Sequence, residues 1–303
     1  MRRALSAWQL GATLYMPATR KDIIDVILHQ KIAGLRSLII CLEDAVSDND
    51  IPEALNNLAH ILQQLNISKT QQDRNNWPLL FLRPRNIEMA KQLTTQLDLN
   101  VIDGFVLPKF TLNCLTLWWE IMQQTNLYMM PTLETQEVFD VIAMQKLANS
   151  LTQHECKQRI IALRIGGNDL LNVLSLRRPS GMTLYDTPMG YVIKMLVSVF
   201  VPKGFALTAP VCEHIDDLNI IKNEFALDIA HGLVGKTAIH PAQIDLIQRS
   251  LTVSQLQYTD ALKILDCQQA VFKSAGAMCE PATHRKWAQS IITRQQIYGI
   301  ANT

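Results

Sequence analysis

The sequence predicts an α/β fold in which eight parallel strands close into a (β/α)8 barrel with additional C-terminal helices. Short apolar runs alternate with longer amphipathic segments, as in parallel sheets. The runs are continuously apolar, which is typical of strands covered on both faces. Eight such runs within 303 residues match the number that a closed barrel needs.

The eight apolar runs are the expected strands. An open doubly wound sheet is the structural alternative, but its glycine-rich first turn is absent from the first loop, Pro17-Ala18-Thr19-Arg20. In chain order the strands are Ala12–Met16, Leu38–Leu42, Leu79–Leu82, Phe105–Leu107, Leu127–Leu133, Ile160–Ile165, Phe205–Ala209 and Thr237–Ile239.

Amphipathic segments between these runs are the expected helices. The long stretch from Leu170 to Lys203 exceeds one crossover and holds the loop SLRRPSG followed by a further helix, Gly190–Val201. The other expected helices are Arg20–Ala33, Pro52–Leu65, Ile87–Leu97, Leu115–Thr125, Glu137–Leu151 and Asp216–Ala230.

After the eighth strand about fifty residues remain that a barrel does not need. They predict two helices, Ser254–Lys273 and Pro281–Gly299. We expect residues 1–250 to form the catalytic barrel. Residues 251–303 then form a helical extension that covers a mouth or reaches a neighbouring subunit.

Composition excludes several classes of protein. With 48% hydrophobic residues the chain can bury a sizeable core, and a net charge of +1 does not fit a nucleic-acid binder. Six scattered cysteines without a CxxC pair predict reduced thiols in a cytoplasmic protein. Arg2 and Arg3 resemble the start of a signal peptide, but Gln9 interrupts the apolar stretch, which favours a first strand. No run approaches the roughly 18 apolar residues of a membrane span.

Charged residues follow most of the expected strands, where barrel enzymes place their chemistry. Acids that converge there raise one another's pKa unless arginines or a metal neutralise them, although Asp44 and Asp169 also fit ordinary helix caps. Oxygen ligands without a Cys/His pair favour Mg²⁺ over zinc. The residues at the strand ends are Arg20, Glu43, Asp44, Arg83, Lys109, Glu134, Asp169 and His240.

Seven motifs occur in a family-like order: LYMPATR, IICLEDAV, LFLRPRN, DGFVLPKF, PTLET, IGGNDLL and GLVGKTAIHPAQI. From about Leu14 to the end, the chain resembles the citrate lyase beta-subunit-like branch of the HpcH/HpaI aldolase superfamily. It is also similar to malyl-CoA and citramalyl-CoA lyases. More narrowly, it resembles carbon–carbon bond lyases of TIM-barrel fold found with tellurite-resistance-type stress genes. The resemblance implies a lyase that depends on Mg²⁺, or Mn²⁺ in its place, and forms a trimer or a multiple of one.

The resemblance implies a metal site and a substrate-binding arginine. The family's metal glutamate falls on Glu134 and its second ligand on Asp169, which here follows Asn168 where many members have Glu. The substrate-binding arginine falls on Arg83, and the asparagine that follows it is displaced by one place, to Asn86.

Further positions carry over from the family's motifs. The acids of the L-E-D element fall on Glu43 and Asp44, the first-loop arginine on Arg20 and the V-L-P-K lysine on Lys109. The resemblance thus makes Arg20, Arg83 and Lys109 the substrate-binding cations. Malyl-CoA-lyase relatives end with a lid that supplies an acid, often from the next subunit. The segment GAMCE places Glu280 at that position.

The lyase activity that the resemblance implies would cleave a carbon–carbon bond through a metal-stabilised enolate. Arg83 would hold the oxyanion or carboxylate, Glu43 and Asp44 would orient metal-bound water or Arg83, and Glu280 would act as general acid/base. The alternative is that Arg83 only bridges Glu43 and Asp44 as a structural ion pair.

Some motif residues also have plainer interpretations. His240 is expected to shape the eighth loop rather than act as a base. Arg177 and Arg178 would either meet a phosphate or remain solvated.

The function expected is a Mg²⁺-dependent lyase for a small oxo or hydroxy acid, or for its CoA thioester. Thioester hydrolysis on the same groups is a second hypothesis, and a non-catalytic acid-binding subunit is a third. The expected partners are the small acid or acyl-CoA and further copies of the chain, with neither nucleic acid nor membrane.

Overall fold

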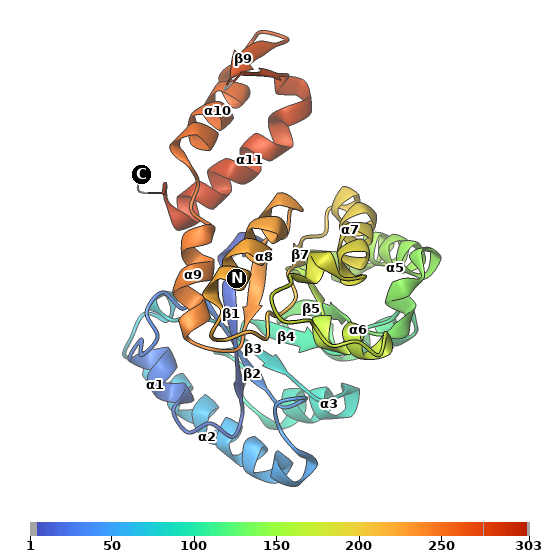
Figure 1. Ribbon diagram of the computed structural model, residues 1–303. Helices are drawn as coiled ribbons and strands as arrows, with labels where there is room; N and C mark the ends of the chain where they lie inside the picture. The colour runs from blue at the N-terminus through green and yellow to red at the C-terminus, as the bar shows by residue number, and fades with distance from the viewer. Residues whose placement is uncertain (1–4, 275, 302–303) are drawn as a thin grey trace.

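A closed ring of eight parallel strands forms the body of the computed structural model, which describes residues 5–274 and 276–301 (Figure 1). Arg2 and Arg3 lie outside these ranges. The strand order is β7-β6-β5-β4-β3-β2-β1-β8, and a parallel bridge between Ala209 and Lys236 joins the two ends. The predicted barrel is therefore confirmed. Its strands are β1 Gly11–Pro17, β2 Ser37–Cys41, β3 Leu79–Arg83, β4 Gly104–Leu107, β5 Tyr128–Leu133, β6 Leu163–Ile165, β7 Leu207–Thr208 and β8 Gly235–Ala238.

Helices surround the ring and follow the predicted order with two additions, α6 and α9. The first helix is shorter than predicted, because His29 leaves helical geometry and Gln30 has a φ of 48°. Among the described residues, none of the helices is long and apolar enough to cross a membrane. The helices around the barrel are α1 Ile23–Leu28, α2 Ile51–Ser68, α3 Ile87–Gln96, α4 Leu115–Met122, α5 Val141–Gln153, α6 Gly167–Val173, α7 Met189–Phe200, α8 Leu218–Ala230 and α9 Ala242–Ser250.

The barrel interior changes from apolar to polar along the strands. An apolar cluster fills the interior nearer the amino ends of the strands. It includes Ile39, Phe81, Val106 and Met130. Residues nearer the carboxyl ends of the strands, including Arg83, are polar and line a cavity. Since inward-pointing side chains alternate along each strand, one layer of the interior can be apolar while the next is polar.

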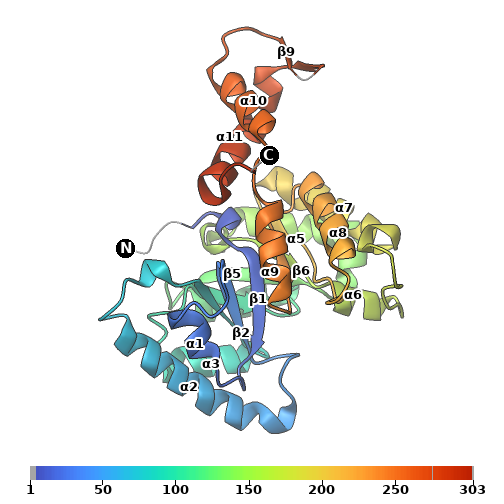
Figure 2. The ribbon, with the colours of Figure 1, turned by 60° about the vertical axis from the view of Figure 1, so that its left-hand side comes forward.

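The C-terminal arm, residues 251–301, leaves the barrel after α9 and stands off it in both views (Figure 1 and Figure 2). Helices α10 (Gln255–Asp266) and α11 (Pro281–Tyr298) pack on a small core of their own. The arm is rooted at the amino ends of the strands. There the Tyr298 hydroxyl donates to the Trp8 carbonyl, and Arg36 Nη2 donates to the Ile297 carbonyl at 2.7 Å.

The predicted helix from 254 to 273 is too long. Cys267, with φ −70° and ψ 131°, ends α10. Beyond it, β9 (Phe272–Ser274) and β10 (Ala277–Cys279) form an antiparallel hairpin. The hairpin carries the chain to α11. Because the arm is attached at the amino ends of the strands, it does not cover the carboxyl-end mouth of its own barrel (Figure 1 and Figure 2).

Buried charges connect the loop after α6 to the barrel wall. Lys236 Nζ on β8 lies 2.9 Å from Glu224 Oε1 and 2.8 Å from Asp228 Oδ2, both on α8. Arg178 from the loop pairs with Glu224 and also with Glu213 at 2.7 Å. The expectation that Arg178 meets a phosphate or stays solvated is therefore wrong, because α8 and the seventh loop supply its counter-charges.

We predict that Lys236→Met destabilises the fold by about 3–5 kcal/mol, because it leaves Asp228 and Glu224 buried without their shared cation. Lys21→Met is the control, since Lys21 pairs with Glu53 at 2.6 Å on the surface. An exposed pair contributes at most about 1 kcal/mol. Urea unfolding monitored by circular dichroism measures both changes, and equal midpoints for the two variants would contradict the prediction.

Candidate functional site

Arg83, the last residue of β3, is the centre of the charged mouth. Its guanidinium is 2.6 Å from Glu43 Oε2, 3.0 Å from Asp44 Oδ2 and 3.2 Å from Glu134 Oε1. Arg83, Glu43 and Glu134 are buried, so these contacts lie in a low-dielectric environment. The carboxyl ends of β2, β3 and β5 thus meet around one cation, as expected for parallel strands in a barrel.

Glu134 follows β5, and its surroundings disfavour the ionised form of its carboxyl group. Burial raises the pKa of the carboxyl to about 7, although the Arg83 charge and a hydrogen bond from the Lys109 N–H oppose that shift. The Lys109 N–H donates to Glu134 Oε1 at 2.8 Å. Nearby Asp169 and Glu43 add negative charge that also raises this pKa. A carboxylate in this position gains from any further positive charge that is placed beside it.

Glu43 and Asp44 share the opposite side of Arg83. Burial raises the pKa of Glu43 despite the Arg83 charge. For Asp44 burial also raises the pKa, but the hydrogen bond with Glu43 and the Arg83 charge outweigh it, so the pKa of Asp44 lies below its usual value. The pKa values of these two neighbouring carboxyls are therefore shifted in opposite directions.

Lys109 joins the two groups of acids. Its Nζ is 2.8 Å from Glu43 Oε1 and 3.7 Å from Asp169 Oδ1. Its backbone has a φ of 47°, in the left-handed region that non-glycine residues rarely adopt. This conformation aims the main-chain N–H at Glu134 while the side chain spans the mouth. Backbone strain of this kind clusters at functional sites.

Gly166 makes room for the Glu134 carboxylate. A Cβ at this position would lie 2.4 Å from Glu134 Oε2, closer than real side chains approach. The second glycine, Gly167, begins α6 and places Asp169 in the first turn of that helix. The two glycines after β6 therefore let both carboxylates line the same cavity.

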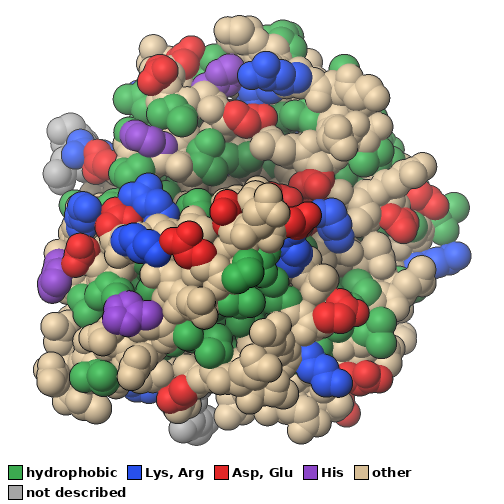
Figure 3. Space-filling view, turned by 90° about the horizontal axis from the view of Figure 1, so that it is seen from below, with side chains coloured by type: hydrophobic (Ala, Val, Ile, Leu, Met, Phe, Trp, Pro, Cys, Tyr) green, Lys and Arg blue, Asp and Glu red, His purple; other side chains and the backbone are tan. Residues whose placement is uncertain are grey.

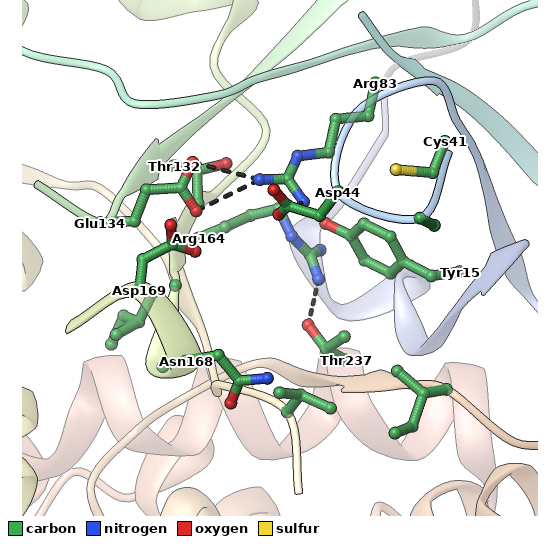
Figure 4. Close-up of a pocket in the computed structure, with 16 residues that line it drawn as sticks. Tyr15, Cys41, Asp44, Arg83, Thr132, Glu134, Arg164, Asn168, Asp169 and Thr237 are labelled. Carbon is green, nitrogen blue, oxygen red and sulfur yellow. Dashed lines mark hydrogen bonds and ion pairs between the residues drawn. The ribbon is translucent and has the colours of Figure 1, made fainter. Parts of the chain in front are cut away.

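A cavity of about 250 Å³ lies among these groups, open at the mouth (Figure 4). Figure 3 shows acidic and basic side chains gathered near the middle of the face opposite the arm. Side chains from within the strands also line the cavity. They were not predicted as site residues. They are Tyr15, Cys41, Thr132, Arg164 and Thr237.

Of these additional residues, Tyr15 and Arg164 contribute most to the electrostatics. The Tyr15 ring lies 5.9 Å from the Arg83 guanidinium and 5.3 Å from that of Arg164. Burial raises the pKa of Tyr15 above its ordinary value, so its hydroxyl stays protonated. Burial likewise raises the pKa of Cys41, which is inconsistent with a thiolate nucleophile. The sequence signal for Arg164 was a single arginine within an apolar run.

Eight residues were predicted to bind metal, bind substrate or take part in catalysis. The structure brings six of them together, and the other two, Arg20 and Glu280, lie elsewhere. The six are Glu43, Asp44, Arg83, Lys109, Glu134 and Asp169. Arg20 is exposed and paired with Asp22 at 2.7 Å, so it does not line the cavity. Glu280 precedes α11 on the arm. His240 is exposed, and its Nδ1 accepts from the Ala242 N–H at 3.2 Å, in keeping with a loop-shaping role.

Two carboxylates of the cavity, Glu134 and Asp169, suit a magnesium ion. Within the described ranges, no three His, Cys, Asp or Glu side chains form a preformed metal cage. Mg²⁺ does not need one, because it usually takes one or two carboxylates together with water and substrate oxygens. The space at Gly166, the carboxylate oxygens of Glu134 and Asp169 in one cavity, and the raised pKa of Glu134 fit this group.

A closed parallel barrel with a small, charged cavity at the carboxyl ends of its strands is the arrangement in which barrel enzymes place their active sites. The chain belongs to the family of carbon–carbon bond lyases of the TIM-barrel fold, which matches residues 4–300. It is therefore a carbon–carbon lyase, and the predicted enzyme class is confirmed. None of the curated proteins matches the chain in sequence.

Solved structures share the fold at low identity. CitE from Mycobacterium tuberculosis, in complex with magnesium, acetoacetate and coenzyme A, is 19% identical over 94% of this chain and 98% of its own, with a TM-score of 0.68. A citrate lyase from Burkholderia xenovorans LB400 is 15% identical over 99% and 98%, with a TM-score of 0.72. RipC from Yersinia pestis is 20% identical over 82% and 98%, with a TM-score of 0.60.

Removing the Glu134 charge should stabilise the metal-free protein at pH 8. The pKa of about 7 exceeds the ordinary value of 4.5, so stability is lost as pH rises between these values. Glu134→Gln abolishes this loss, which is worth on the order of 1–3 kcal/mol. Near pH 4 the two proteins should unfold alike.

Adding Mg²⁺ should reverse that order, because it stabilises only the protein that binds it. Thermal unfolding at both pH values, with a chelator or with excess Mg²⁺, measures these differences. Glu137→Gln, three residues along on the exposed 3-10 helix Gln136–Phe139, is the control and should behave as wild type. A Mg²⁺ shift of equal size in Glu134→Gln and wild type would refute a metal site at Glu134.

Proposed function

We propose that this chain is a Mg²⁺-dependent lyase that cleaves a small oxo or hydroxy acid, or its CoA thioester, to an enolate and a carbonyl product. The observation that carries the proposal is a buried arginine, Arg83, that pairs with Glu134 at a small cavity which Asp169 also lines. A carbon–carbon bond that breaks beside a carbonyl leaves negative charge on oxygen. The site supplies fixed positive charge where that oxygen would lie.

A magnesium ion held by Glu134 and Asp169 would supply Lewis-acid charge to the oxo or hydroxy group of the substrate. The chain's own residues do the rest. Arg83 presents a planar guanidinium whose Nε has no partner in the described structure, so it can donate to an oxyanion. Because Glu43 and Asp44 fix its position, little reorganisation is needed as charge develops.

Lys109 and Glu43 are placed to control a proton at the mouth. Burial lowers the pKa of Lys109, but Glu43 and Asp169 outweigh it and the pKa is raised, so the ammonium persists. Glu43, with its raised pKa, is the group beside it that takes up or releases a proton. We infer that this pair maintains the charge balance around Arg83 during turnover.

CitE, solved with magnesium, acetoacetate and coenzyme A, supports a metal-dependent reaction on a short acid. A second structure, the citrate lyase beta subunit of M. tuberculosis complexed with oxaloacetate and magnesium, supports the same class of ligand. A direct assay of malyl-CoA, citramalyl-CoA and citryl-CoA against their free acids, with and without Mg²⁺, tests the proposal. Release of free CoA without a 2-oxo acid would indicate a thioesterase instead.

Arg83→Lys should lower kcat/KM by about 10²- to 10³-fold, because an ammonium cannot reproduce the donors of the guanidinium. Arg85→Lys is the matched control: Arg85 lies two residues away and contacts Asp48 and backbone carbonyls outside the cavity. Steady-state kinetics with the substrate found in the assay measure both. Retained activity in Arg83→Lys would reduce Arg83 to a structural ion pair.

We further propose that Glu280 serves the mouth of a neighbouring subunit as general acid/base. The arm that carries it is rooted at the opposite end of its own barrel. The arm also exposes apolar side chains, which in a protein of this kind indicate a contact surface. These side chains are Leu256, Leu262, Val271, Met278 and Trp287.

Subunit complementation tests this arrangement. Glu280→Gln and Glu134→Gln should each lose about 10²-fold or more in kcat as homo-oligomers. Co-expressed, they should regain about a quarter of wild-type activity, since randomly mixed subunits bring intact arms to intact mouths in that proportion. No recovery in a mixed oligomer isolated with two affinity tags would place Glu280 outside catalysis in trans.

A further inference from the structure

Arg164 is a buried cation in the cavity without an acidic partner. Its side chain is only 2% exposed, and no carboxylate in the described part of the chain lies within ion-pair distance. Its Nη2 donates a hydrogen bond to the hydroxyl of Thr237 (Figure 4). By contrast, the other buried cations of the barrel, Arg83, Arg178 and Lys236, each face at least two carboxylates. Burying a charge without compensation is costly, which points to a ligand that supplies the missing negative charge.

The polar atoms around Arg164 also lack partners. Arg164 Nη1 and the hydroxyl of Thr132 are both buried without a hydrogen bond in the described structure. Thr132 on β5 is the register partner of Arg164 on β6, so the two side chains lie at the same level of the barrel. Both line the cavity. A carboxylate is the small group that satisfies a guanidinium edge and a neighbouring hydroxyl together.

Arg164 lies deeper in the barrel than Glu134 and Asp169, the two carboxylates that suit a metal. Arg164 precedes Gly166 by two residues, and Gly166 contacts Glu134. Two residues along a strand correspond to about 7 Å, so Arg164 lies closer than Glu134 to the amino ends of the strands. Figure 4 shows the Arg164 side chain between those of Glu134 and Tyr15. The cavity thus has two positions for negative groups, one above the other.

We propose that Arg164 binds a second carboxylate of the substrate, which makes the substrate a dicarboxylic oxo or hydroxy acid. This inference rests on the proposed function, in which the first carboxylate and its oxo or hydroxy group bind beside Glu134 and Asp169. A cavity of about 250 Å³ is smaller than the clefts of roughly 300–1,000 Å³ that hold larger ligands. The small volume fits a short acid, and the charged floor disfavours an uncharged thioester at that end.

Calorimetric binding of two matched hydroxy acids in the presence of Mg²⁺ tests the inference. (S)-malate and (S)-2-hydroxybutyrate share the same 2-hydroxy acid end, and a methyl group replaces the distal carboxylate in the second. Malate should bind wild type about 10- to 100-fold more tightly, as expected for a charge-assisted contact made only by the second carboxylate. Equal affinities would overturn the inference without any variant.

Arg164→Met then assigns the preference to this side chain. The variant should lose the 10- to 100-fold advantage of malate while its affinity for 2-hydroxybutyrate stays within about 3-fold of wild type. Arg74→Met is the control, because Arg74 pairs with Asp103 at 2.5 Å outside the cavity. It should keep the preference for malate. A malate preference that survives Arg164→Met in a folded protein, or a similar loss for both acids, would refute a role for Arg164 in recognising the second carboxylate.

The same titrations separate this inference from the proposed function. If binding of both acids depends on Mg²⁺ and on Glu134 but shows no preference for malate, only the role of Arg164 fails. The opposite outcome is a preference for malate that Arg164→Met removes but that persists without Mg²⁺ and in Glu134→Gln. In that case the metal-dependent function fails, and Arg164 remains an anion-binding residue.

Discussion

The ion pairs of Arg83 are the constraint on which the mouth of this barrel depends. Barrel closure brings the carboxyl ends of β2, β3 and β5 together, and with them Glu43, Asp44 and Glu134. Without Arg83 these acids would repel one another in a buried space. With it, Glu134 still has a pKa near 7, so compensation is incomplete. The fold thus holds a site that is short of positive charge where a metal would bind.

The sequence predicted the barrel well because the apolar runs and their spacing reflect burial of the strands on both faces. Two of the missed elements have little periodicity. Helix α6 is short and begins with Gly167, and the β9–β10 hairpin lies in an arm whose short strands are not fully buried. The extent of α10 was wrong because its amphipathic pattern continues past Asp266, where the backbone has already left the helix.

Reasoning from strand ends located the charged mouth but not its floor. Residues after a strand, such as Glu134, stand out because an apolar run stops there. Tyr15, Arg164 and Thr237 lie within strands, and their inward direction depends on the register, which the sequence alone does not fix. Arg20 follows β1, but Asp22 two residues later holds it at the surface. A strand-end position is thus informative only when no nearby counter-charge captures the side chain.

The left-handed backbone of Lys109 and the role proposed for its side chain favour different amino acids at this position. Glycine or asparagine adopts a φ of 47° with less strain than lysine does. A library selected for thermal resistance alone would therefore enrich such replacements, and each would remove the ammonium that joins Glu43 to Asp169. At this position the residue that relaxes the backbone and the residue that completes the mouth are different amino acids, so improvement in one property is paid in the other.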